Sequence, residues 1–357
     1  LENIFIQFLR QLVTAIALRQ LQAGHSLAAS ELHSMDFILN CFRKPTKLDA
    51  ATLECQDAST SGAIIDALKG DAGFGKLSTF EGDAIVQRDD EDAEKLQKGV
   101  DASVAAGVLP KLNPPPTYQV IDVLGKTPDD VCDAILKHMG DAANKGGVVV
   151  LCGLSGTGKG TTVAKLQARL GPGKTKTWSN GDVFRSLTLL AATWREKNYN
   201  PAWDKALTPT RVAEFMGMLE FGKFDGSWDI RVRGLGVDAL VSKVKNTTLK
   251  APLVAKNIPT VAERTQGEVV TFAAAAAKKM GDDGLVVLLE GREATVNYIP
   301  SPYRYTLTMS DRAVLGQRRA AQRLAAAVLK DVGEGASDEA IAASLRKQLA
   351  AFLEEVP

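Results

Sequence analysis

Apolar residues beyond residue 120 are spaced in two ways, and each spacing predicts one kind of element. Short runs rich in β-branched residues predict buried parallel strands at 146–152, 285–291 and 303–310. Strict alternation predicts a further strand at 227–234. Apolar residues at helical spacing predict helices at 161–170, 208–221, 259–280, 311–332 and 338–355. Strands that alternate with helices favour an α/β fold, with a parallel sheet flanked by helices.

Capping residues indicate where two of the helices begin. Thr127 suits the N-cap of a helix, Pro128 suits its first helical position, and the acidic residues that follow suit its first turn. Ser337 precedes Asp338 and Glu339 in the same way at the start of the last helix.

The first third of the chain lacks this regularity. Short helices are expected at about 60–69 and 90–107, beside the acidic run "RDDEDAEKLQ", and no strand is evident. Three consecutive prolines in "LPKLNPPPTY" (109–118) cannot lie inside a helix. We therefore place a boundary here, between a mostly helical or irregular N-terminal region (1–116) and a second domain (117–357).

The extreme N-terminus, residues 1–23, is apolar at helical spacing. Charged residues interrupt it, so it is too short and too charged to span a bilayer. It also lacks the basic start and the small-residue cleavage site of a secretory signal. Three interpretations stay open: an amphipathic docking helix, part of an organelle-targeting segment, or residues 1–34 as sequence upstream of a start at Met35. A cytoplasmic location is expected, with a plastid or mitochondrion as the alternative.

The composition narrows the classes of partner. The chain has 43 basic and 42 acidic residues, and this balance gives no electrostatic footprint for nucleic-acid binding. The four cysteines are widely spaced, without a C-x-x-C pair, and are expected to be reduced thiols. With three scattered histidines, neither a zinc site nor a His-based metal centre is expected.

Two glycine-rich stretches share the pattern G-x-x-x-x-G-K, which is typical of phosphate-binding loops. "GLSGTGKGTT" (153–162) follows a predicted strand and precedes a predicted helix, so backbone amides and a helix N-terminus would converge on a phosphate. "GDAGFGKLST" (70–79) follows a segment with helical spacing, and Gly82 is expected to interrupt any helix after it. We predict a loop without a ligand there, and one phosphate site in the chain.

The stretch 153–162 resembles the loop of the nucleoside monophosphate kinases, and most closely that of bacterial-type cytidylate kinases. Gly160 stands between Lys159 and the hydroxyl of Thr161, as in that family. Further matches follow in the family's order, at 179–192, 229–244, 261–273 and 289–319. The resemblance spans about 146–325 and implies a three-layer P-loop kinase fold, with an insertion at about 194–258 that closes over the acceptor.

The resemblance also implies roles for individual residues. ATP would be bound by Gly153, Ser155, Gly156, Thr157, Gly158, Lys159, Gly160, Thr161 and Thr162. Mg²⁺ would be held at Thr161 and Glu290. The acceptor nucleotide would contact Gly181, Phe184, Arg185, Arg231, Arg264, Arg292 and Glu293, because arginine suits bidentate binding of phosphate. The catalytic residues would be Lys159, Arg185, Arg292, Arg318 and Arg319.

The chain departs from the family after Arg323. The arginine-rich lid segment and the last strand of the family are not found, and Arg346 is the only later arginine. Arginines of the predicted helix 311–332, including Arg318 and Arg319, would take over the lid.

Three functions therefore stay in competition. The first is phosphorylation of a nucleoside monophosphate, with CMP or dCMP favoured as the acceptor. The second is a nucleotide-binding subunit that is catalytically weak or inactive, with residues 1–116 as the region for a protein partner. The third is a P-loop kinase that acts on another small acceptor.

Overall fold

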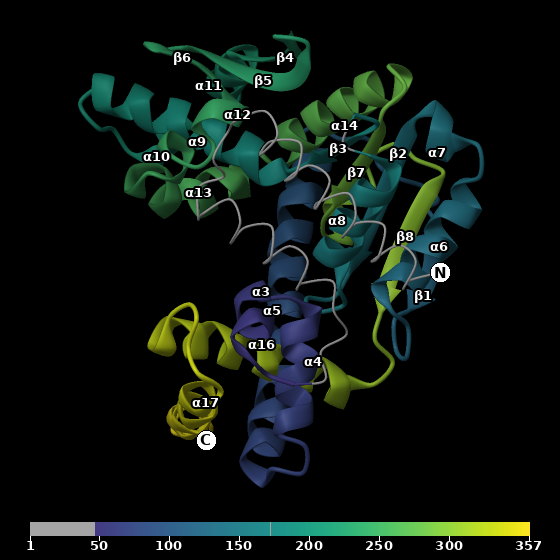
Figure 1. The fold of residues 1–357 in the computed structure, drawn as a ribbon. Helices are drawn as coiled ribbons and strands as arrows, with labels where there is room; N and C mark the ends of the chain where they lie inside the picture. Colours follow the sequence, from purple (N-terminus) through teal and green to yellow (C-terminus); the bar gives the residue numbers. More distant parts are fainter. Residues whose placement is uncertain (1–46, 172) are drawn as a thin grey trace, which may run out of the picture. The chain divides into compact units, whose positions relative to one another are not determined.

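The computed structural model describes residues 47–171 and 173–357 (Figure 1). The described residues form a larger unit, 87–310, and a smaller unit that joins 47–86 to 311–357. The predicted apolar segment 1–23 and the candidate start at Met35 lie outside the described residues.

The two units divide at different places from the boundary that the prolines predict. One division falls inside helix α5 (Ala72–Ala105), and the other follows the last strand, at Ser310. Residues 87–116 therefore belong with the sheet, while the last two helices belong with the N-terminal helices.

A five-stranded parallel sheet forms the centre of the larger unit, in the order β1-β8-β2-β7-β3. Its strands are β1 (Gln119–Asp122), β2 (Gly147–Gly153), β3 (Thr175–Trp178), β7 (Val286–Glu290) and β8 (Tyr303–Thr308). The central strand β2 is flanked by β7 and β8, and its residues from Val149 to Leu151 are fully buried. The α/β class and the parallel sheet are thus confirmed.

Helices cover the sheet because the strands are apolar on both faces. The covering helices are α6 (Pro128–Met139), α7 (Ala142–Lys145), α8 (Lys159–Leu170), α14 (Gln266–Asp282) and α15 (Glu293–Val296). Helix α9 (Asn180–Lys197) follows β3 and packs on α14 and on the helices of the insertion. Val148 and Val150 of β2 share one core cluster with Ala273 and Ala277 of α14. Helices α6 and α8 pack on each other and on the strands, so the sheet is flanked by helices, compatible with a three-layer fold.

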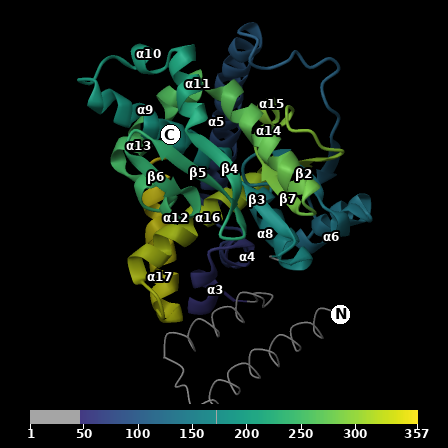
Figure 2. The same cartoon turned by 90° about the horizontal axis from the view of Figure 1, so that it is seen from above.

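The predicted insertion carries a second, antiparallel sheet of three strands, β4-β5-β6 (Figure 2). Its elements are α10 (Trp203–Ala206), α11 (Pro209–Gly217), β4 (Leu219–Phe224), β5 (Ser227–Gly234), β6 (Val237–Leu240), α12 (Val241–Val244), the 3₁₀ helix η1 (Thr248–Lys250) and α13 (Pro252–Arg264). Phe221 stacks on Trp228 with 5.0 Å between ring centroids, and the Trp228 indole N–H donates to Asp283 at the end of α14. These contacts attach the second sheet to the helices of the first.

The smaller unit is a helical cluster around α16. It contains α3 (Ala50–Cys55), α4 (Ala58–Ala67), the first part of α5, α16 (Arg312–Val332) and α17 (Asp338–Leu353). Leu324 and Val328 of α16 are fully buried against the other helices. Helices α5 and α16 cross at two glycines, where Gly316 lies against Ser78 and Gly82.

The stretch 70–79 is helical, which corrects the loop that its glycines predict. Helix α5 begins at Ala72 and continues through Gly82. A Cβ on Gly82 would lie 3.4 Å from the Cα of Gly316, so this glycine serves the close crossing of two helices. Tertiary packing therefore overrides the low helix propensity of glycine here.

Three further elements differ from the sequence prediction. The helix predicted at 208–221 ends at Gly217, because β4 begins at Leu219. The helix predicted at 259–280 is two helices that meet at Thr265. Strand β1 was not predicted, and it pairs with β8 in parallel register.

The cysteines in the described part of the chain are of two kinds. Cys132 and Cys152 are free and buried, as expected, but Cys55 is disulfide-bonded, so the expectation of reduced thiols is wrong for it. Within 47–171 and 173–357, no helix has the length and apolar character needed to cross a membrane.

Candidate functional site

The glycine loop lies between the end of β2 and the start of α8, as its sequence predicts. Gly153, Gly156 and Gly158 have φ of +130°, +85° and +87°, conformations that residues with a Cβ rarely adopt. No side chain caps the N-terminus of α8. The first amides of a helix have no partner within it, so this turn presents N–H groups and the positive end of a helix dipole.

The glycines have two different steric roles. A Cβ on Gly153 would lie 2.1 Å from the carbonyl oxygen of Leu307 in β8, so this glycine lets the loop leave the sheet. At Gly158 and Gly160, a Cβ would meet no described atom within 4 Å. The loop is therefore tight against the sheet at its start and open beside the first turn of α8, which is where a phosphate would need to approach.

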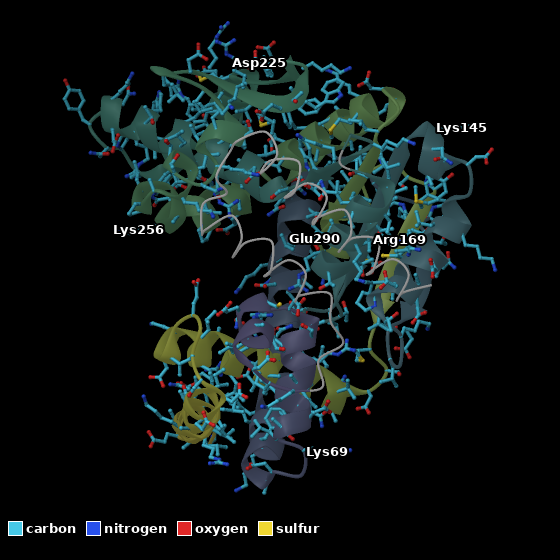
Figure 3. All side chains as sticks on the ribbon, in the orientation of Figure 1. Lys69, Lys145, Arg169, Asp225, Lys256 and Glu290 are labelled. Carbon is cyan, nitrogen blue, oxygen red and sulfur yellow. The ribbon has the colours of Figure 1, made fainter. Side chains whose placement is uncertain are left out.

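Lys159 is folded back over the loop. Its Nζ donates to the carbonyl oxygens of Gly153 and Leu154, both at 2.8 Å. Burial lowers the pKa of Lys159, and the positive charge of Arg292 adds to the effect, while Glu290 opposes it. Glu290 is exposed at the end of β7, in register with Leu151 of β2 (Figure 3). A lysine and a carboxylate therefore lie at the same edge of the sheet.

The threonines of the loop differ in exposure. Thr157 is buried and its hydroxyl donates to the carbonyl of Leu154 at 2.8 Å, so it braces the loop. Thr162 is also buried, whereas Thr161 is partly exposed in the first turn of α8. Thr161 is therefore the hydroxyl better placed to reach a metal ion. The described residues hold no cluster of three or more metal-ligating side chains, so an ion here would need phosphate and water as further ligands.

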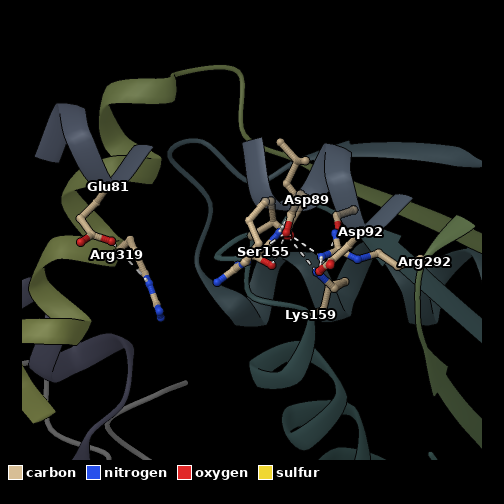
Figure 4. A network of polar contacts seen from close by, with 11 residues as sticks. Glu81, Asp89, Asp92, Ser155, Lys159, Arg292 and Arg319 are labelled. Atoms are coloured by element: carbon tan, nitrogen blue, oxygen red, sulfur yellow. Dashed lines mark hydrogen bonds and ion pairs between the residues drawn. The ribbon is translucent and has the colours of Figure 1, made fainter. Parts of the chain in front are cut away.

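An unpredicted carboxylate, that of Asp89 in α5, contacts the loop (Figure 4). The Ser155 N–H donates to Asp89 Oδ2 at 2.6 Å, and the Ser155 hydroxyl donates to Oδ1 at 2.9 Å. The guanidinium of Arg292 donates to Oδ1 at 2.6 Å. Burial by itself would raise the pKa of Asp89, but these hydrogen bonds outweigh it and hold that pKa well below the usual range. The carboxylate is therefore ionised at neutral pH.

Two predicted acceptor residues lie at the start of α9, directly after β3. Gly181 is in the first turn, and a Cβ there would lie 3.0 Å from the guanidinium of Arg185. Arg185 itself is paired with Asp182 at 3.2 Å, one turn before it, and is partly exposed. Phe184 packs against the core. Because parallel strands end at one edge of the sheet, Arg185 and the glycine loop belong to the same edge.

The turn after β7 holds two more predicted residues. Arg292 is the N-cap of α15, and Glu293 is the exposed first residue of that helix. Arg292 lies 3.7 Å from Asp92 in addition to its contact with Asp89. The predicted acceptor arginine is therefore engaged by carboxylates of α5.

Two predicted acceptor arginines are held in ion pairs of the insertion. Arg231 donates two hydrogen bonds to Asp238, at 2.7 and 2.8 Å, across β5 and β6. Arg264 donates to Asp204 at 2.7 Å, from the end of α13. No described contact joins either of them to the glycine loop, and a structural role accounts for both contacts.

The predicted lid arginines lie on α16, in the smaller unit. Arg319 is 3.8 Å from Glu81, and Arg323 pairs with both Glu81 and Glu355. Arg318 is half-buried without a hydrogen-bond or ion-pair partner among the described residues, and burial lowers its pKa. Arg318 is thus the lid candidate whose charge is not already neutralised.

We compared the chain with protein-family models, with curated proteins and with solved structures. None of them matches it. The chemistry of the chain is therefore inferred from its own residues at the edge of the sheet where the parallel strands end.

That edge combines uncapped amides, a lysine, an acidic residue and two arginines, a set that suits phosphates and their counter-ion. Sequence reasoning found the loop because the signal is local. The acidic run around residue 90 is visible in the sequence, but the contact of Asp89 with the loop is not. Only the fold decides which of several neighbouring carboxylates is buried.

Proposed function

We propose that the larger unit binds ATP at the glycine loop and transfers its terminal phosphoryl group to a nucleoside monophosphate, with CMP or dCMP favoured. The observation that carries this proposal is the uncapped N-terminus of α8, which follows β2 through glycines of positive φ and begins at Lys159. Backbone amides, a helix dipole and a lysine charge together suit a chain of phosphates.

The acceptor side of the proposal rests on two arginines at the same edge. Arg185 follows β3 and Arg292 follows β7, and guanidinium groups bind phosphate oxygens in bidentate fashion. ATP would supply the phosphoryl group, and Mg²⁺ would neutralise charge with Thr161 and Glu290 as the residues that would hold it. The protein's own task is then to orient two phosphates in line and exclude water.

A second candidate function is nucleotide binding with little or no turnover, as a structural or assembly subunit. Two observations favour it. Arg292 is already neutralised by Asp89, and Arg185 is already paired with Asp182. Under this function, residues 1–116 would be the region that binds a protein partner.

The test is release of ADP by the full chain with ATP and Mg²⁺, measured separately with CMP, dCMP, UMP, AMP and GMP. Lys159→Ala removes the positive charge at the loop and should lower kcat about 100-fold or more. This is the usual effect of removing one group that stabilises charge in the transition state. Lys165→Ala is the matched control, because Lys165 lies on the same helix and pairs with Asp129 away from the loop. The control should retain turnover.

The outcomes separate the two candidates. Turnover that requires one monophosphate and disappears in Lys159→Ala supports the kinase and identifies its acceptor. A Lys159-dependent rise in melting temperature with ATP, without consumption of any monophosphate, rejects the kinase and supports the binding subunit.

A further inference from the structure

The segment of α5 that belongs to the larger unit carries several acidic residues, and one of their carboxylates is buried against the glycine loop. The side chain of Asp89 is 1% exposed, whereas Asp90 and Glu91 beside it are exposed. A buried charge is unfavourable unless it is paired and hydrogen-bonded. Among these neighbouring carboxylates, the fold therefore buries that of Asp89 at the site. The hydrogen bonds donated to Asp89 compensate for the unfavourable free energy of burying its charge.

The donors around Asp89 are the groups that proteins use for phosphate oxygens. They are a backbone N–H of a glycine loop, a hydroxyl and a guanidinium, from Ser155 and Arg292. The same carboxylate thus joins the loop proposed for the donor to the arginine proposed for the acceptor.

We propose that Asp89 is an internal anion that occupies the phosphate position between Ser155 and Arg292, so that a bound polyphosphate must displace it. The site is then autoinhibited by α5, and Arg292 is released for the acceptor only when Asp89 leaves. This inference rests on one part of the proposed function, namely that the glycine loop binds polyphosphate. It does not depend on turnover.

The displacement has a measurable consequence. When the binding-competent state is a minor population, the apparent affinity is reduced by that fraction. Removing the internal anion should therefore tighten the binding of a polyphosphate. If Asp89 merely positioned Ser155 and Arg292, its removal would weaken the binding of a polyphosphate instead.

The experiment measures the dissociation constants of inorganic tripolyphosphate and of ATP for the full chain by calorimetry. Asp89→Asn keeps the size of the side chain and removes its charge, and it should tighten tripolyphosphate binding about tenfold or more. Asp90→Asn is the matched control, because it removes the same charge from the adjacent, exposed position. The control should bind like the unchanged protein, which separates displacement from a general loss of negative charge.

Unchanged or weaker binding by Asp89→Asn would overturn the inference and make Asp89 a positioning residue. If Asp89→Asn does not fold, hydrogen exchange of the unchanged protein decides the matter. Tripolyphosphate should speed the exchange of α5 amides near residue 89, and unchanged or slower exchange there would also overturn the inference.

The failures are distinguishable. The kinase alone fails if tripolyphosphate binds more tightly to Asp89→Asn but no monophosphate is consumed. The inference alone fails if a monophosphate is phosphorylated while Asp89→Asn binds no more tightly. If no Lys159-dependent binding of tripolyphosphate is found in any of the proteins, both are rejected.

Discussion

Replacing Gly153 with alanine should destabilise the larger unit at the point where the loop leaves the sheet. The Cβ would lie 2.1 Å from the carbonyl oxygen of Leu307, and the residue has φ of +130°. A positive φ costs an alanine about 1–2 kcal/mol, and overpacking typically adds about 1–3 kcal/mol. Together these effects remove about 2–5 kcal/mol, a large part of the usual stability of a domain.

The assay is thermal unfolding followed by circular dichroism, with Gly160→Ala as the matched control. Gly160 lies in the first turn of α8, directly after the loop, without positive φ and with no described atom within 4 Å of an added Cβ. For a unit of this size, Gly153→Ala should lower Tm by on the order of 10 °C, while the control should stay near the unchanged protein. If both variants melt within about 2 °C of the unchanged protein, the tight approach of the loop to β8 is refuted.

Two other predictions concern helix packing and pH. Gly316→Ala should destabilise the smaller unit by about 1–3 kcal/mol in urea unfolding, because its Cβ would lie 2.0 Å from the Ser78 carbonyl, whereas Gly75→Ala, in open space on α5, should not. The pKa of Asp89 is lowered in the folded protein, so its contact with Arg292 adds stability above the unfolded value of about 3.9. The stability difference between the unchanged protein and Asp89→Asn should be constant around neutral pH and should decrease progressively as the pH falls below about 3.9, being lost completely only at the lower pKa of the folded protein. A difference that does not decrease at all in acid would contradict the assigned ion pair.

Elements with local signals were predictable from the sequence. Thr127 forms a capping box at the start of α6, and Ser337 caps α17, as their positions indicated. The strand before the glycine loop was evident because a continuous β-branched run has few alternatives to a buried strand. In each of these elements, neighbours in the sequence supply the interactions that define it.

Elements that depend on distant partners were missed. Strand β1 has four residues, two of them exposed, and its place in the sheet comes from β8 far along the chain. Helix α5 tolerates Gly82 because Gly316 lies against it. The ion pair of Arg264 with Asp204 also joins residues far apart in sequence. No local pattern contains these partners.

The segment before the glycine loop and the segment after β8 contribute to different units. Strand β1 is the edge strand beside β8, and the larger unit ends at Ser310, shortly after β8. Helix α16, which follows β8, instead packs with α4 and α17 in the smaller unit. Strand β1, which precedes the glycine loop in the chain, therefore supplies the edge of the sheet beside β8. Release of Arg292 from Asp89 would be needed for the proposed kinase, but consumption of a monophosphate is what separates that kinase from a binding subunit.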